Sequence, residues 1–234
     1  MFVERNLIIS ILKLTKSGPI DYEIVRKDAR IPKSSLTNLL KKMQNEGLLY
    51  LCQDKILAVG NSRLKLAYRA LALGADIQRV SNLLCWQEFE KITVIALEKH
   101  GYSVKRNLRF KQRERRWELD VVGFSRPIVL CIDCKDWHCR ISVAALKKIV
   151  QAQLERTQAL VDSVPQISVN LDCNAWKQTK FFPVVLSLQS NEFKFYKKVP
   201  VVSVFQLQDF LFELPAYIDF LKHFTRNSQY LGSC

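Results

Sequence analysis

The spacing of apolar residues changes along the chain, and this change constrains the fold more than any other feature. Before residue 47, apolar positions recur at helical spacing, with breaks at Ser17-Gly18-Pro19 and Arg30-Ile31-Pro32. Two short apolar runs around the polar turn Gln53-Asp54-Lys55 follow, and this pattern predicts a β-hairpin. Beyond residue 82, strand-like runs are mixed with long helical stretches, which predicts an α/β domain with a mixed central sheet. We therefore expect two domains of different fold class.

The expected domains are residues 1–60, a helical connector at 61–81, and residues 82–225. The N-terminal helices are expected at 3–16, 22–29 and 34–46, with Asp21 as the cap of the second. In the second domain, helices are expected at 82–100, 141–162 and 206–224. Its strands are expected at 103–110, 116–122, 128–134, 182–188, 193–197 and 200–205.

The chain carries a large excess of positive charge. Lys and Arg number 36 against 22 Asp and Glu, which gives a formal net charge of +14 and an isoelectric point near 9.6. The first 80 residues hold 14 basic and 7 acidic residues, so both expected domains share the excess. Such a charge concentrates polyanions, which makes DNA the expected partner and an anionic membrane surface the alternative.

The cysteines indicate a reducing compartment. There are 7, an odd number, in apolar contexts such as Val129-Leu130-Cys131-Ile132, which suits buried thiols better than disulfides. Cys131 and Cys134 would point to opposite faces of one strand, so with His138 and Cys139 they do not suggest a zinc site. Neither a secretory signal nor an uncharged run near the roughly 18 residues of a membrane span is found. We expect a cytoplasmic, nucleoid-associated protein without a membrane partner.

The first domain has the element order of a winged helix-turn-helix, which is mainly helical and carries a β-hairpin wing. The segment "IPKSSLTNLLKKMQNEGLLYL" resembles the turn, recognition helix and wing of winged-helix regulators. Its apolar stripe consists of Leu36, Leu39, Leu40 and Met43. The residues left outside, and therefore expected to contact DNA, are Lys33, Ser35, Thr37, Asn38, Lys41 and Lys42. A solvated face without a binding role is the alternative interpretation.

Two carboxylates and a lysine are expected to meet in the second domain. Asp120 lies in one expected strand, and Asp133 and Lys135 lie two residues apart in the next, hence on the same face. The turn at 123–127 makes the two strands neighbours. Carboxylate oxygens hold a hard cation such as Mg²⁺ or Mn²⁺, which activates water, while a lysine orients that water or neutralises developing charge.

These residues resemble the PD-(D/E)xK nuclease superfamily, which includes Mrr-like restriction endonucleases and archaeal Holliday junction resolvases. The pattern is Asp120 followed by Asp133-Cys134-Lys135 at the end of an apolar strand. Asp133 stands where many relatives have Glu, and no Pro precedes Asp120. The similarity spans roughly residues 82–214 and implies an α/β restriction-endonuclease-like domain with Asp120 and Asp133 as metal ligands and Lys135 as a catalytic residue.

The resemblance also implies residues on the flanking helices. The segment "WQEFEKITVIALEKHGYSV" is similar to the first helix of the Mrr-like branch, which makes Glu90 an auxiliary acid and metal ligand, with Glu88 as second choice. On a helical wheel Glu90 falls among apolar neighbours, an unusual place for a lone carboxylate. A glutamine after the lysine strand approaches the site in several branches, and Gln151, or else Gln153, matches it.

A basic segment leads into the Asp120 strand. Its residues are Lys105, Arg106, Arg109, Lys111, Arg113, Arg115 and Arg116, opposed by Glu114 and Glu118. Arg106, Arg109, Arg115 and Arg116 are expected to hold the DNA backbone. For Lys111 and Arg113, a solvated hairpin tip is an equal alternative.

The sequence therefore predicts a Mg²⁺- or Mn²⁺-dependent DNA endonuclease that a winged helix carries to DNA. Because cutting both strands usually requires two sites, a homodimer is expected. Two alternatives remain: a non-catalytic DNA-binding regulator with a degenerate nuclease domain, and a structure-specific junction-resolving nuclease.

Overall fold

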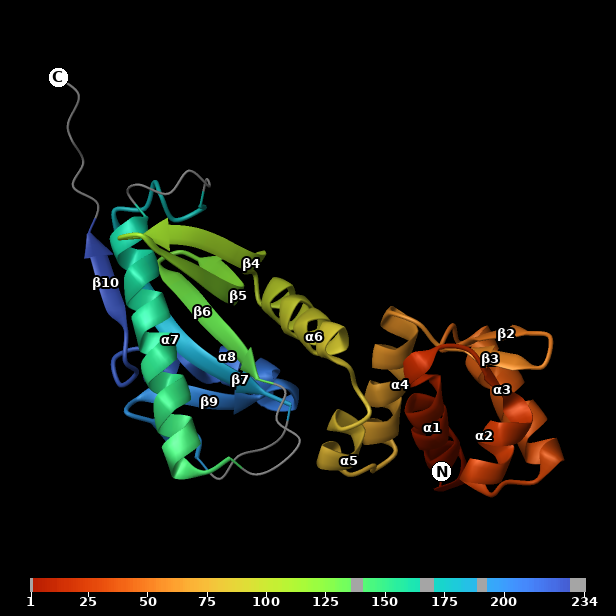
Figure 1. Cartoon of the computed structure of the whole chain (residues 1–234). Coiled ribbons are helices and arrows are strands. Elements are labelled where there is room, and N and C mark those ends of the chain that lie inside the picture. Colours follow the sequence, from red (N-terminus) through yellow and green to blue (C-terminus); the bar gives the residue numbers. More distant parts are fainter. Residues whose placement is uncertain (1, 136–140, 165–170, 189–192, 228–234) are drawn as a thin grey trace. The chain divides into compact units, whose positions relative to one another are not determined.

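The computed structural model describes residues 2–135, 141–164, 171–188 and 193–227 (Figure 1). The chain divides into two compact units, Met1–Phe89 and Glu90–Cys234. The division falls inside helix α6 (Trp86–Lys99) and not at residue 82. The expected connector belongs to the first unit, because α4 (Asn61–Ala72) packs against α1 (Phe2–Leu14) and buries Leu64, Leu66 and Ala70.

The first unit begins with α1 and the short 3-10 helix η1 (Thr15–Ser17), followed by strand β1 (Ile20–Asp21). Helices α2 (Tyr22–Ala29) and α3 (Lys33–Asn45) come next, then the hairpin of β2 (Tyr50–Cys52) and β3 (Lys55–Leu57). The strands form an antiparallel sheet in the order β1-β3-β2. Helix α5 (Ile77–Ser81) follows α4.

Local signals in the sequence explain how α2 begins and ends. The Asp21 carboxylate accepts a hydrogen bond from the Glu23 backbone N–H at 2.7 Å, as an N-cap does, which confirms the expected cap. Arg30 has a left-handed backbone with φ of 55°, which ends the helix. The apolar stripes of α1, α2 and α3 then meet in a core that includes Leu7, Ile11, Val25, Leu36 and Met43.

A buried ion pair lies in the first unit. Arg63 Nε donates to Glu88 Oε1 at 2.6 Å, and both side chains are almost fully buried. The remaining guanidinium N–H groups donate to the Leu12 and Leu83 carbonyls and to Thr15 Oγ1, while Glu88 Oε2 accepts from the Cys85 N–H. Because nearly every polar atom of the pair is hydrogen-bonded, the desolvation cost of burying it is offset.

The second unit is a mixed α/β domain, as expected, and its sheet is large. The described part of this unit contributes seven strands in the order β4-β5-β6-β7-β9-β8, with β10 paired to β7. The pairs β4–β5 and β5–β6 are antiparallel, whereas β6–β7 and β7–β9 are parallel. The strands are β4 (Ser103–Gln112), β5 (Arg115–Ser125), β6 (Ile128–Lys135), β7 (Gln178–Ser187), β8 (Phe195–Tyr196), β9 (Val199–Ser203) and β10 (Phe224–Asn227).

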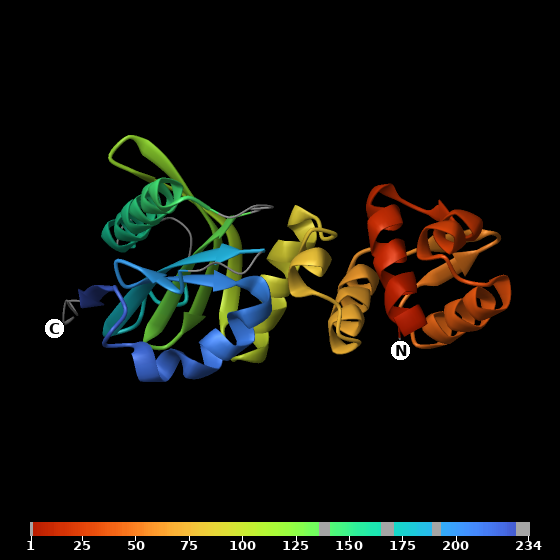
Figure 2. The ribbon, with the colours of Figure 1, turned by 90° about the horizontal axis from the view of Figure 1, so that it is seen from below.

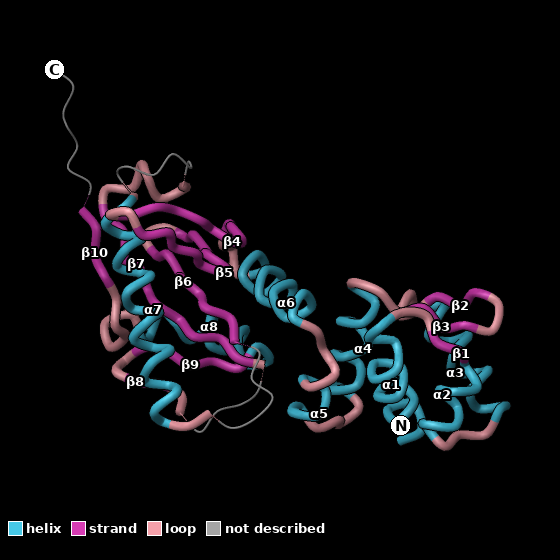
Figure 3. Tube along the Cα trace, viewed as in Figure 1, coloured by secondary structure: helices cyan, strands magenta, loops and turns pink. Residues whose placement is uncertain are grey.

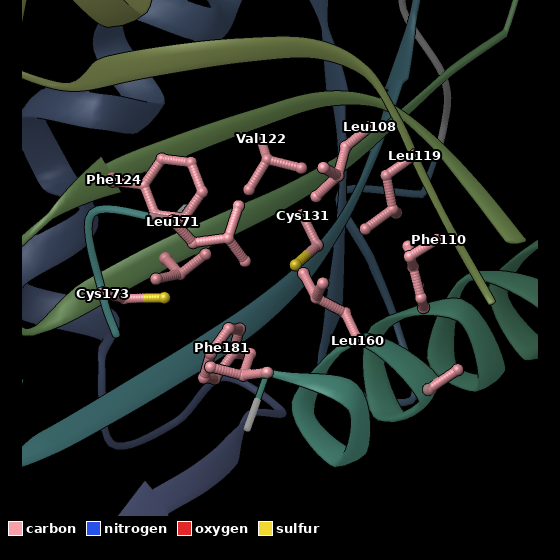
Figure 4. Packing of buried hydrophobic residues seen from close by; sticks show 13 residues of the cluster. Leu108, Phe110, Leu119, Val122, Phe124, Cys131, Leu160, Leu171, Cys173 and Phe181 are labelled. Atoms are coloured by element: carbon pink, nitrogen blue, oxygen red, sulfur yellow. The ribbon is translucent and has the colours of Figure 1, made fainter. Parts of the chain in front are cut away.

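Helices cover both faces of this sheet (Figures 1 and 2). Helix α7 (Val143–Ser163) packs on one face, against β4, β5, β7 and β10. The core beneath it is shown in Figure 4 and includes Leu108, Phe124, Cys131, Leu160 and Phe181. Helix α8 (Leu207–Tyr217) lies on the other face, after the 3-10 helix η2 (Val204–Gln206).

Helix α6 also packs on the sheet, and a glycine makes room for it. A Cβ atom added to Gly123 of β5 would lie 3.2 Å from the Leu97 side chain and 3.3 Å from that of Tyr102. Contacts this tight would require the Leu97 and Tyr102 side chains to shift slightly, so the missing Cβ eases the approach of α6 to β5.

Most expected elements are present within a few residues of their predicted ends (Figure 3). The expected helix at 206–224 is an exception, because α8 ends at Tyr217 and Phe224–Asn227 form β10 instead. Strand β10 pairs with the first residues of β7, Gln178–Phe181. On the opposite edge of β7, the pairing with β6 begins only at Lys180. Among the described residues, no helix has both the length and the apolar character needed to cross a membrane.

Candidate functional site

One cleft of the second unit collects most of the residues that the sequence analysis selected. It has a volume of about 340 Å³ and is formed by β5, β6 and α7. Its lining residues are Arg115, Arg116, Trp117, Glu118, Asp120, Asp133, Lys135, Ala152 and Arg156. The structure therefore brings Asp120, Asp133 and Lys135 together.

Strand β6 places Asp133 and Lys135. Cys131 lies in the core under α7, and because side chains alternate along a strand, Asp133 and Lys135 share its face. β6 is paired on both sides, with β5 through Ile132↔Val121 and with β7 through Asp133↔Val185. Beyond Ile132 the strand end that carries the two residues is paired with β7 alone, through Asp133↔Val185 and Lys135↔Ser187, and Asp133 is buried while Lys135 is half-buried.

Asp120 lies where the alternation of β5 changes phase. Leu119 and Val122 both belong to the core under α7, although they are three positions apart and strict alternation would place them on opposite faces. The irregularity faces Asn107 of β4, which has a left-handed φ of 49° between the regular pairs Arg106↔Val121 and Leu108↔Leu119. The Asp120 carboxylate accepts a hydrogen bond from the Cys134 N–H at 2.8 Å, which fixes it beside the end of β6.

The environment of Asp120 makes its charged form less favourable than it would be in water. Burial raises the pKa of this carboxyl above its ordinary value, and the neighbouring charge of Asp133 raises it further. The Cys134 N–H, Lys135 and Arg156 oppose the shift without cancelling it. A cation between the two carboxylates would remove this repulsion.

Asp133 has one oxygen with two cationic partners and one with none. Its Oδ1 accepts hydrogen bonds from Lys135 Nζ and from Arg156 Nη1, both at 3.0 Å. Its Oδ2 is buried and, within the described part of the chain, has no hydrogen-bond partner. An unpaired buried oxygen is costly, so Oδ2 marks a place for a cation or a bound water.

The pair Asp120 and Asp133 fits the way Mg²⁺ is usually bound, by one or two carboxylates together with several waters. No third carboxylate, His or Cys of the described residues joins them. Within residues 2–135, 141–164, 171–188 and 193–227, no three His, Cys, Asp or Glu side chains lie close enough together to hold a metal ion. Asp120, Asp133 and waters are therefore the candidate ligands.

Glu90 lies near this pair but outside the cleft lining. Burial, followed by the charges of Asp120, Asp133 and Glu90, raises the pKa of the Cys134 thiol well above its ordinary value. The charge of Glu90, which is half-buried on α6, therefore acts on Cys134 together with those of Asp120 and Asp133. Glu88 is tied to Arg63 in the buried ion pair, so the second choice of auxiliary acid has a structural partner instead.

Helix α7 contributes residues that differ from the expected one. Gln151 is exposed, hydrogen-bonds Glu155 and does not line the cleft. Two residues further, about 200° around the helix, buried Gln153 donates to the Cys131 carbonyl of β6 at 2.6 Å. Arg156 follows three residues later on the same side and enters the cleft. The sequence analysis missed Arg156, for which its spacing from Gln153 was the available signal.

A second cleft adjoins the first along the β4–β5 hairpin. Its volume is about 530 Å³, and it is lined by Arg109, Phe110, Lys111, Arg116, Trp117 and Glu118. Of the expected DNA-contacting residues, Arg115 and Arg116 line the first cleft and Arg109 lines the second. Arg106 is exposed on β4 and lines neither cleft.

On α3 of the first unit, Lys33, Thr37, Asn38 and Lys41 are exposed and Ser35 is half-buried. Lys42 is exposed as well, but its Nζ lies 3.4 Å from Glu4 Oε2 of α1, so this side chain is partly engaged within the unit. His138 and Cys139 lie outside the described residues. Cys131 and Cys134 are buried free thiols.

No protein-family model matches the chain. An uncharacterized protein of Archaeoglobus fulgidus is 29% identical over 134 residues, which are 57% of this chain and 94% of that relative. The chain also resembles the crystal structure of a protein of unknown function, AF1548, with a TM-score of 0.35 and 14% identity over 49% of this chain. Protein VC1899 from Vibrio cholerae gives a TM-score of 0.40 and 11% identity over 93% of this chain. The chain spans 57% and 50% of these two solved chains, and none of the three descriptions names a function.

Proposed function

We propose that this protein is a divalent-metal-dependent DNA endonuclease of the PD-(D/E)xK type, carried to DNA by a winged-helix module. One observation carries the proposal: Asp120, Asp133 and Lys135 line a single cleft that also holds Arg115, Arg116 and Arg156. Carboxylates that can share a hard cation, beside cations that attract a phosphate, are the requirements for metal-assisted phosphodiester hydrolysis.

Asp120 and Asp133 would hold Mg²⁺ or Mn²⁺, and Glu90, which lies outside the cleft lining, would support the site as an auxiliary acid. When bound, the cation polarises the scissile phosphate and lowers the pKa of a bound water. Lys135 Nζ, now 3.0 Å from Asp133 Oδ1, is placed to orient the attacking water or to neutralise the developing charge. Gln153 holds the Cys131 carbonyl and thereby steadies the β6 backbone two residues before Asp133.

The element order α1-β1-α2-α3-β2-β3 with a three-stranded sheet supports a winged helix in the first unit. In such a module α3 would enter the major groove, and Lys33, Asn38 and Lys41 are free to contact DNA from its exposed face. We also propose a homodimer, because each copy carries one candidate site and a duplex has two strands to cut.

The test is cleavage of supercoiled plasmid by the purified chain with Mg²⁺, with Mn²⁺ and with EDTA. We expect metal-dependent nicking that falls by about 100-fold or more in Asp133→Ala and in Lys135→Ala, because each change removes charge from the reacting centre. Asp209→Asn and Lys99→Ala, which change exposed residues of like charge outside the cleft, should leave cleavage unchanged.

Two results would contradict the proposal. Cleavage that survives Asp133→Ala would place the chemistry elsewhere, provided that circular dichroism shows the variant folded. Binding of DNA without cleavage under any metal condition would favour the non-catalytic regulator.

A further inference from the structure

The cleft on the β4–β5 hairpin has no assigned role in holding a metal, yet it joins the acidic cleft directly. Arg116, Trp117 and Glu118 line both. A nucleic-acid strand whose phosphate lies at Asp120 and Asp133 could therefore continue along the hairpin. The volume of about 530 Å³ falls within the range of small-ligand pockets.

An aromatic side chain at the junction has features that suit a nucleobase. The Arg115 guanidinium lies over the Trp117 ring, 3.8 Å from its centroid, so a planar cation is stacked on an indole. The Trp117 Nε1–H is buried and, among the residues that the structure describes, no acceptor lies within hydrogen-bonding distance. Indole and guanidinium planes are surfaces on which unpaired bases stack.

The charge of the hairpin cleft suits a phosphate backbone. Arg109, Lys111 and Arg116 outnumber Glu118 along its wall. The Arg109–Glu118 pair is 76% and 44% exposed, and an exposed pair contributes little, so Arg109 can exchange its partner for a phosphate at small cost.

We infer that the hairpin cleft holds an unpaired nucleotide of DNA beside the bond that is cleaved. The inference rests on the proposed function and narrows its substrate to DNA with a bulged, flapped or splayed strand. In an intact duplex both faces of every internal base are covered by the neighbouring bases, so no base is free to stack on the Arg115–Trp117 pair.

The test measures binding in EDTA, so that no cleavage is needed. Two oligonucleotide duplexes of one sequence carry 2-aminopurine either fully paired or in a single-nucleotide bulge. We expect the bulged duplex to bind the full chain about tenfold more tightly, with quenched 2-aminopurine fluorescence, as one additional base stack would give. Trp117→Leu, and the double change Arg109→Gln with Lys111→Gln, should each reduce the preference to about twofold or less.

Arg126→Gln is the matched control, because this exposed arginine lies in the turn at the opposite end of β5. If Trp117→Leu fails to fold, Trp117→Phe and the exposed Arg115→Gln replace it, and both should weaken the quenching. Equal affinity for the two duplexes, or a preference that survives these changes, would overturn the inference. Cleavage with Mg²⁺ by the same preparation is measured separately. A preference without cleavage would support the unpaired-nucleotide site and contradict only the proposed nuclease, whereas cleavage without a preference would contradict the site alone.

Discussion

At the scale of single residues, Asp133 binds two cationic side chains in the cleft. It is 4% exposed, yet its Oδ1 accepts from both Lys135 and Arg156. Lys135 belongs to the expected motif, whereas Arg156 comes from α7 and doubles the positive charge at one oxygen. A phosphate entering the cleft offers Arg156 a second anionic partner, so this arginine is a candidate phosphate-positioning residue.

We expect Arg156→Ala to raise KM for DNA about tenfold, because one charge-assisted hydrogen bond is lost, and to change kcat less. Arg156→Lys should recover part of the loss, since it keeps the charge but not the planar donor. Steady-state cleavage kinetics of the three proteins provide the measurement. A lower melting temperature with unaltered kinetics would instead assign Arg156 a purely structural role.

The residues of the candidate site were predictable from sequence to different degrees. Asp120, Asp133 and Lys135 could be selected because strand alternation and a short turn determine which side chains are neighbours. Gln151 was selected although it does not line the cleft, and Arg156, which does, was not selected. The packing of Leu146, Val150 and Leu160 determines which side of α7 faces β6, and the sequence does not show this packing. The phase change at Asp120 also depends on a distortion across the sheet, at Asn107, which no local pattern reveals.

At the scale of elements, local signals predicted helices and long strands well. The cap at Asp21 and the stripe on α3 act within a few residues, so the sequence displays them. Strands β1 and β10 were not predicted, because each is short and forms only by pairing with a strand distant in sequence. β1 pairs with β3, and β10 pairs with β7, which lies more than forty residues earlier.

Helices α1, α3 and α4 meet at one carboxylate. Glu4 accepts from Arg69 at 2.9 Å and lies 3.4 Å from Lys42. Burial tends to raise the pKa of Glu4, but the bonds and charges of Arg69 and Lys42 outweigh it and lower the pKa below the ordinary 4.5. A lowered pKa in the folded state means that Glu4 stabilises the fold above the ordinary value and that this contribution disappears as the pH falls through the folded pKa.

Glu4→Gln is therefore expected to lower the free energy of unfolding by about 1 kcal/mol at pH 7, with the difference shrinking toward pH 3. Urea unfolding at the two pH values checks this. Glu46→Gln, at the exposed C-cap of α3, is the control and should lower the free energy of unfolding at pH 7 by less than Glu4→Gln does. A Glu4 effect that stays constant between the two pH values would show that the ion pairs do not stabilise the unit.

At the scale of the whole molecule, positive charge is spread over both units rather than held in one tail. The distribution of Lys and Arg along the sequence predicted this, and the alternation of strand-like and helical runs predicted the mixed α/β class of the second unit. The division inside α6 was not predicted, because the periodicity of a continuous helix does not change where the contacts around it change.

The contribution of α3 to DNA binding can be measured from the salt dependence of duplex affinity, in EDTA. If Lys33 and Lys41 each contact a phosphate, the double change of both to Gln should reduce the slope of log K against log salt concentration by about 2. The double change Lys194→Gln with Lys197→Gln removes the same charge from exposed positions of the second unit and should leave the slope unaltered. An equal reduction of the slope in both double variants would mean that the lysines of α3 contact DNA no more than other exposed lysines do.

The two walls of the cleft differ in how freely their sequences can vary. On the β4–β5 side, Arg109, Lys111, Arg115 and Arg116 are exposed, so exchanging them alters what the wall attracts while the interior stays packed. On the α7 side, Arg156 follows Gln153 and precedes Thr157, both of which are fully buried. Substitutions there disturb the interior as well as the cleft. Changes of substrate preference are therefore easier through the hairpin than through the helix.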